Sequence, residues 1–211
     1  MPCRKSIGRE KKTVGAKERN TVERVVFQDF AGTLLVRRVI VVDESSTHIG
    51  MIAQYARAPR GKRAYDSTLR NYGHNLTLIA GWRLTGMEAP MVIEGAVNTA
   101  VFEAYVRDVL CPTLQAGDVV IMDNLSSHKA SVITALIESC GACIVWLPKY
   151  SPDFSPIEKA FSKLKQIIKR RKAQTLDELI EAITHALQLI TETDACGWFT
   201  ACGYLNLDQS T

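Results

Sequence analysis

Val119-Val120-Ile121-Met122-Asp123 is an apolar run that ends on a carboxylate, and the fold can be worked out from it. A short run of this kind after the turn Gly117-Asp118 is typical of a buried strand. The run Val39-Ile40-Val41-Val42 ends in the same way on Asp43. If the two strands lie side by side in one sheet, Asp43 and Asp123 project at the same edge.

A third carboxylate, Glu158, lies at the start of a predicted helix, with thirty-four residues between it and Asp123. Ser155 occupies the N-cap and Pro156 the first helical position, and the helix is expected to end near Lys172. Two strand-end carboxylates and one at a helix start suit hard metal ions held over a phosphate. The sequence therefore predicts metal-dependent phosphodiester chemistry.

Each of these acidic residues also has a purely structural interpretation. Glu158 and Ser155 have the spacing of a capping box, in which the glutamate bonds back to the N-cap amide. Asp43 has the character of a turn cap, and Asp123-Asn124 that of an Asx turn. Their occurrence together, in this order, favours a shared metal site.

The remaining periodicity predicts an α/β fold, a mixed sheet flanked by helices. Residues 75–82 and 90–94 flank the turn Thr85-Gly86 and are expected to form an antiparallel meander. Apolar residues at three- and four-residue steps predict helices, and one more apolar run predicts a strand. The helices are expected over 101–110, from about 127 to the C-cap Gly141, over 156–172 and over 176–191, and the strand over 143–147.

The chain has 211 residues, 46% of them hydrophobic, which is enough for one sizeable core. Residues 1–24 hold eight Lys or Arg and three Glu, so the excess of positive charge is concentrated there. We expect residues 1–30 to be a basic N-terminal tail or linker remnant and residues 31–211 to be the catalytic domain. The sequence has no apolar run of about eighteen residues and no signal-peptide core, so no membrane contact and a cytoplasmic location are expected.

Three motifs surround the acidic residues. They are Val42-Asp43-Glu44-Ser45, Met122-Asp123-Asn124-Leu125-Ser126-Ser127-His128 and Leu147-Pro148-Lys149-Tyr150-Ser151-Pro152-Asp153-Phe154-Ser155-Pro156-Ile157-Glu158. The motifs resemble those of the DDE transposases, specifically the bacterial insertion-sequence branch of the mariner superfamily. The resemblance covers roughly residues 36–204 and implies a ribonuclease H-like fold. It also implies that Asp43, Asp123 and Glu158 are the catalytic, metal-binding triad.

The implied activity is DNA transposition, in which metal-dependent strand cleavage is followed by strand transfer. Mg²⁺ is the expected cofactor, with Mn²⁺ able to substitute, because the site offers carboxylate oxygens. Asn124 and His128 are assigned as supporting residues. The expected partners are DNA, at transposon ends and target, and a second copy of the chain in a homodimer. Family members carry an N-terminal helix-turn-helix region, which we expect to be supplied separately. DNA binding would place the protein at the nucleoid.

Two basic groups are candidates for contact with DNA. One is a row of lysines that shares a stripe of the predicted 156–172 helix with Glu158, and the other is a basic loop with interleaved tyrosines. The candidate residues are Arg57, Arg60, Lys62, Arg63, Lys165, Lys169 and Lys172. An ordinary solvated basic surface is the alternative interpretation of both groups.

Two other functions are compatible with the same acidic residues. A nuclease of the same fold, such as a junction resolvase or a hybrid-cleaving ribonuclease, would cut without strand transfer. An inactive, domesticated relic would bind nucleic acid or a partner transposase without turnover. An oligonucleotide integration assay separates the three, because a nuclease produces only cuts and a relic produces nothing.

Overall fold

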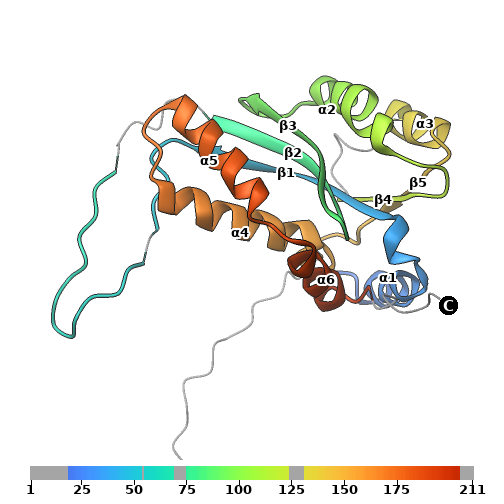
Figure 1. Ribbon diagram of the computed structural model, residues 1–211. Helices are drawn as coiled ribbons and strands as arrows, with labels where there is room; N and C mark the ends of the chain where they lie inside the picture. Colours follow the sequence, from blue (N-terminus) through green and yellow to red (C-terminus); the bar gives the residue numbers. More distant parts are fainter. Residues whose placement is uncertain (1–18, 54, 69–74, 124–130, 205–211) are drawn as a thin grey trace, which may run out of the picture.

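A five-stranded sheet in the order β3-β2-β1-β4-β5 forms the centre of the computed structural model, which describes residues 19–53, 55–68, 75–123 and 131–204 (Figure 1). Strand β1 pairs antiparallel with β2 and β2 with β3, whereas β4 lies parallel to both β1 and β5. The predicted mixed sheet is therefore confirmed. The strands are β1 (Val39–His48), β2 (Asn75–Arg83), β3 (Gly86–Glu94), β4 (Val119–Met122) and β5 (Cys143–Trp146).

Helices cover both faces of the sheet (Figure 1). One face packs against α1 (Thr21–Thr33), α4 (Pro156–Arg171), α5 (Leu176–Gln188) and α6 (Glu192–Ala201). The other face packs against α2 (Thr99–Tyr105), its π-helical continuation Val106–Leu110, and α3 (Ser131–Ser139). Among the described residues, no helix combines the length and apolar character that crossing a bilayer requires.

Side chains of β1 and β4 divide between the two faces by parity, as expected for a pleated strand. The odd-numbered apolar residues of both strands pack in the core on the α4 side, and the even-numbered ones pack on the α2 and α3 side. Asp43 and Asp123 continue the odd-numbered series. Both carboxylates therefore leave the sheet toward the face that α4 covers.

The parallel register of β1 and β4 sets these two carboxylates side by side. Val39 is opposite Val119 and the pairing runs in step to Val42 and Met122. The next residue on each strand is the aspartate, so the register that pairs the apolar runs also pairs Asp43 with the position of Asp123. The prediction that both project at one edge is confirmed.

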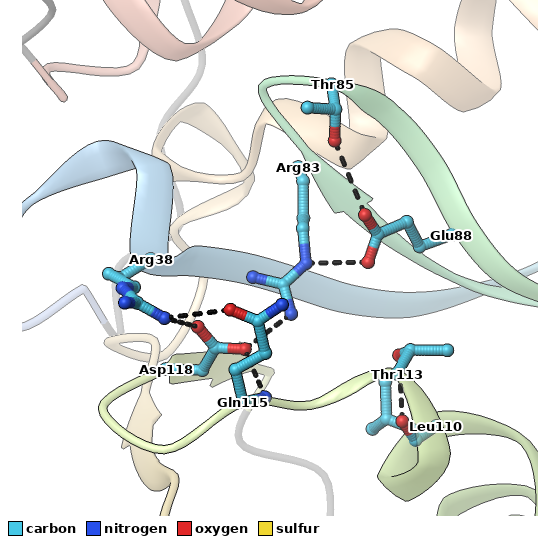
Figure 2. Close-up of polar contacts among 8 residues, drawn as sticks. All are labelled: Arg38, Arg83, Thr85, Glu88, Leu110, Thr113, Gln115 and Asp118. Carbon is cyan, nitrogen blue, oxygen red and sulfur yellow. Dashed lines mark hydrogen bonds and ion pairs between the residues drawn. The ribbon is translucent and has the colours of Figure 1, made fainter.

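An ionic network holds the opposite ends of the same strands (Figure 2). Arg83, at the end of β2, donates from Nη2 to Asp118 Oδ2 at 2.6 Å and from Nε to Glu88 Oε2 at 2.6 Å. Asp118 directly precedes β4, and its Oδ1 lies 3.6 Å from Arg38 Nη1, just before β1. Burial opposes ionisation of Asp118, but bonds from Arg83 and the Gln115 amide outweigh burial and keep its pKa below the ordinary value. The network ties the starts of β1 and β4 to the β2–β3 hairpin.

Helix α1 begins inside the stretch expected to be a basic tail. The Asn20 side chain caps its first turn by accepting from the amides of Val22 and Glu23. Phe27 and Ala31 are buried in the core. Residues 21–30 are therefore packed structure, because an N-cap and two apolar residues four positions apart outweigh the surrounding charge.

Helix α6 was also not expected from the sequence, which predicts one helix over 176–191. In the structure α5 ends at Gln188, and Thr191 starts a new helix through a capping box with Asp194. The Thr191 amide donates to Asp194 Oδ2 at 2.9 Å, and the Asp194 amide donates to Thr191 Oγ1 at 3.3 Å. This reciprocal cap interrupts the apolar periodicity that had predicted a single helix.

We predict that Asp118→Asn lowers the free energy of unfolding by about 3 kcal/mol, because Arg83, 10% exposed, loses its buried partner charge. A urea titration measures this loss. The matched control is Asp108→Asn, whose carboxylate is 59% exposed and pairs with Arg107, and which should lose less than about 1 kcal/mol. Equal losses in the two variants would contradict the structural role given to the network.

Candidate active site

A cavity of about 470 Å³ opens beside the middle of β1, next to the C-terminal end of β4 and the start of α4. The sequence predicts a strand that ends at Asp43, but β1 continues to His48 because its second half pairs with β2. Asp43, Asp123 and Glu158 all line this cavity. The rest of its wall comes from Glu44 and from the segment 147–155 that connects β5 to α4. Three acidic residues that are far apart in sequence thus share one cavity.

Glu158 is held in place by the packing of α4 beneath it. The residues of α4 at helical spacing on its inner face are buried, while Glu158 is exposed on its first turn; the buried ones are Ile157, Ala160, Phe161, Leu164 and Ile168. Within the described part of the chain, the Ser155 side chain accepts no capping hydrogen bond from α4. The Ser155 amide donates instead to the carbonyl of Pro152 at 3.1 Å. The capping-box interpretation of Glu158 is therefore not the arrangement seen.

The electrostatics of Asp43 show that the acidic residues influence one another. The pKa of Asp43 is raised to about 8; burial is the largest cause, and the negative charges of Glu44, Glu158 and Asp123 contribute to the same shift. The Glu44 amide, which donates to Asp43 Oδ1 at 2.8 Å, acts in the opposite direction. A divalent cation relieves this kind of repulsion between carboxylates.

The donor set of the cavity fits Mg²⁺ or Mn²⁺ better than zinc, because it offers carboxylate oxygens. Among the described residues, however, no three His, Cys, Asp or Glu side chains already form a metal-binding group. The carboxylates share a cavity without converging on one point. Asp43, Asp123 and Glu158 are the residues that would hold the ions.

Sequence reasoning assigned no role to Glu44, although it lines the cavity and is half-buried. Successive residues of a strand face opposite sides, so choosing Asp43 gave no reason to choose its neighbour. The available signal was the acidic pair itself, because a second charge directly after a buried apolar run is unusual. Glu44 raises the pKa of Asp43 and so adds to the negative potential of the site.

Of the other predicted site residues, Asn124 and His128 lie outside the described residues. The arginines and the lysine of the basic loop are exposed on the long connection from β1 to β2, which extends away from the sheet (Figure 1). Lys165 and Lys169 are half-buried on α4. Lys172 follows α4 and donates to Asp66 Oδ1 at 2.6 Å, which links the end of that helix to the basic connection. The loop residues are Arg57, Arg60, Lys62 and Arg63.

A mixed sheet of this order, with one carboxylate in the middle of β1, a second directly after the neighbouring parallel strand β4 and a third on the covering helix, defines a ribonuclease H-like protein with an acidic site. Residues 38–180 match the family model of the DDE superfamily endonucleases. The chain belongs to this family. A comparison with curated proteins gave no match.

Solved structures of Mos1 transposase share the fold. A pre-cleavage Mos1 transpososome matches with a TM-score of 0.76 at 13% identity, over 94% of this chain and 64% of that one. The Mos1 paired-end complex with the left transposon end matches with a TM-score of 0.74 at 13% identity, over 94% and 64% of the two chains. The catalytic domain of Mos1 mariner transposase matches with a TM-score of 0.61 at 12% identity, over 86% and 84%. The predicted ribonuclease H-like fold is thus confirmed. This chain spans less than two thirds of the length of the longer Mos1 chains.

We predict that Asp43→Asn stabilises the metal-free protein, and increasingly so as the pH rises. The pKa of Asp43 is about 8 in the folded chain, above its ordinary value of 3.8, so the folded state holds the proton more tightly than the unfolded state does. The free energy of unfolding of the wild type therefore falls as the pH rises from about 4 to about 8, and the Asn side chain lacks this dependence. Thermal unfolding in a chelator should show a melting temperature at least about 2 °C higher for the variant near pH 8.

The advantage of Asp43→Asn should be smaller near pH 5 than near pH 8. Asp108→Asn serves as the control, because the pKa of Asp108 is lowered by its bond with Arg107 and its charge does not change in this range. A melting difference between Asp43→Asn and wild type that is the same at both pH values would show that Asp43 carries no such strain.

Proposed function

We propose that this chain is the catalytic part of a DDE transposase of the bacterial insertion-sequence branch of the mariner superfamily. It would cleave a DNA strand and then join the exposed 3′ hydroxyl to target DNA. One observation carries the proposal: Asp43, Asp123 and Glu158 line one cavity in a chain that belongs to the DDE superfamily endonucleases.

The three carboxylates would hold two Mg²⁺ ions. When bound, such ions activate the attacking oxygen and stabilise the leaving 3′ oxygen of an in-line displacement. Asp43 and Asp123 supply two anionic groups from neighbouring strands whose spacing the sheet fixes. Glu158 supplies the third from α4, so loss of any one carboxylate changes the geometry in which charge develops.

Both reactions would use this cavity in succession. Cleavage leaves a 3′ hydroxyl where the leaving oxygen was, and that hydroxyl is then the nucleophile toward a second phosphodiester. The carboxylates need not move between the two steps, because each step is the same displacement at phosphorus with different attacking and leaving oxygens.

The basic groups would guide DNA to the cavity. Lys165 and Lys169 lie on the same helix as Glu158, about two and three turns farther along its surface, and would neutralise phosphates there. Arg57 and Arg63 belong to the exposed connection that Lys172 links to the end of α4. Both groups therefore border the helix that carries the third carboxylate.

The transposase would work as a homodimer that brings two transposon ends together, as the paired-end complexes of Mos1 transposase suggest by analogy. Recognition of those ends would come from a separately supplied N-terminal helix-turn-helix region. Mn²⁺ would substitute for Mg²⁺; Mos1 paired-end complexes have been solved with each ion.

We predict that Asp123→Asn and Glu158→Gln each reduce DNA cleavage in Mg²⁺ or Mn²⁺ by about 100-fold or more without unfolding the chain. The assay uses labelled duplexes that carry the inverted repeats flanking the coding locus, together with an unlabelled target. Asp177→Asn is the matched control, since Asp177 is an exposed acid on the first turn of another helix, α5. Wild-type activity in either site variant would refute the assignment.

The same assay separates the alternative functions. A transposase gives cut products and joined products, whereas a nuclease of the same fold gives only cuts. A chain that binds metal and DNA but forms neither product is a relic.

We predict that the double variant Lys165→Ala, Lys169→Ala weakens DNA binding and lowers the slope of log affinity against log salt by about 1 to 2, because each phosphate contact contributes about 0.9. Fluorescence anisotropy over a salt series measures both quantities. Lys163→Ala is the control, because Lys163, on the same helix as Lys165 and Lys169, is already paired at 2.5 Å with Asp194 of α6. An unchanged slope in the double variant would identify the row of lysines as ordinary surface.

A further inference from the structure

The segment between β5 and α4 forms one wall of the acidic cavity. Arg24 of α1 contacts this segment from outside the cavity. Arg24 donates from Nη1 to Ser151 Oγ at 2.6 Å and from Nη2 to Asp153 Oδ2 at 2.5 Å. Its guanidinium also lies over the ring of Phe154, 4.4 Å from the centroid. The Arg24 side chain is only 18% exposed, whereas its partner Asp153 is 48% exposed. One planar group thus fixes three positions within four residues.

A second arginine holds the same segment one step earlier. Arg19 donates from Nε to the Tyr150 carbonyl at 2.8 Å and from Nη2 to Asp153 Oδ1 at 2.9 Å. Tyr150 has a φ of 56°, in the left-handed region that non-glycine residues seldom adopt. The bond to its carbonyl helps to hold a backbone conformation that would otherwise relax.

The following turn, Pro152–Phe154, is fixed from two more directions. The ring of Phe154 stacks on Phe27 of α1, with 5.3 Å between centroids. The Tyr204 hydroxyl, which follows α6, donates to the Phe154 carbonyl at 2.9 Å. The turn is therefore held between the N-terminal and C-terminal helices.

This turn leads directly into the helix that carries Glu158. The Ser155 amide donates to the Pro152 carbonyl at 3.1 Å, and the Glu158 amide donates to the Ser155 carbonyl at 3.3 Å. A displacement of the turn is passed along these short links to the first turn of α4. Arg24 is not one of the described residues that line the cavity. It can therefore act on the site only through the 151–154 segment that it contacts.

We propose that Arg24 is a positioning residue that sets where the Glu158 carboxylate lies in the cavity, an inference that rests on the proposed function. Helix α1 is then part of the catalytic unit. The contacts of Arg24 depend on its planar guanidinium, which donates to two groups and lies over an aromatic ring at the same time. A lysine cannot make all three contacts. Arg24→Lys therefore tests the geometry while it keeps the charge.

The first experiment measures Mn²⁺ affinity by electron paramagnetic resonance, with no DNA present. Arg24→Lys should weaken Mn²⁺ binding by about 10-fold, but by less than about 2-fold when Glu158→Gln is already present, because the two residues act as one unit. Unchanged affinity in Arg24→Lys, or an equal loss in both backgrounds, would overturn the proposal. Arg107→Lys, at an exposed arginine of the π-helical segment, is the control.

The second experiment measures single-turnover cleavage at saturating DNA. Arg24→Lys should slow cleavage by about 10-fold or more and leave DNA affinity unchanged, as expected when a reacting group is misplaced. Weaker DNA binding with an unchanged saturated rate would instead make Arg24 a phosphate contact and overturn the proposal. Asp153→Asn, which removes the partner at a half-exposed position, should reproduce both results if Arg24→Lys fails to fold. If the wild type does not cleave DNA, the proposed function fails, while the Mn²⁺ comparison still decides the role of Arg24.

Discussion

The parallel pairing of β1 with β4 is the constraint on which the rest of the structure depends. The register that matches two apolar runs also sets Asp43 beside Asp123, and strand parity directs both toward α4. At the other end of these strands, the bonds of Asp118 to Arg83 and its neighbours fix where each strand starts. Because a shift of one residue would turn a carboxylate into the opposite core, the apolar packing and the acidic site specify the same register.

The third carboxylate depends on packing of a different kind. Helix α4 is held on the sheet by its buried stripe, and its first turn is held by the segment that α1 and α6 enclose. The resulting cavity collects negative charge, and the pKa of Asp43 is raised mainly by burial and further by repulsion from its acidic neighbours. Folding therefore tolerates an electrostatic cost at this edge of the sheet, which the apolar core on both faces outweighs. Such perturbed pKa values are typical of binding and catalytic sites.

Much of this architecture could be predicted from the sequence because its signals are local. Apolar runs ending on an aspartate gave β4 and the first half of β1, although β1 continues past Asp43 to His48. A proline after an N-cap residue gave the start of α4. Helix α1 was missed because its apolar residues are interspersed with charge, and Val22 and Val26 remain exposed in the structure. The ion pair of Arg24 with Asp153 joins residues 129 positions apart, and no local sequence pattern predicts such a contact. Glu44 was not predicted, because neighbouring residues of a strand face opposite sides of the sheet and Asp43 had already been chosen.

The most direct test of the account is a crystal structure of the protein soaked in Mn²⁺, with the ions located by their anomalous scattering. The account predicts manganese in the cavity between β1, β4 and α4, with oxygens of Asp43, Asp123 and Glu158 at about 2 Å from the ions. Manganese bound elsewhere, or bound there without Glu158, would contradict the claim that these three carboxylates form one metal-dependent site.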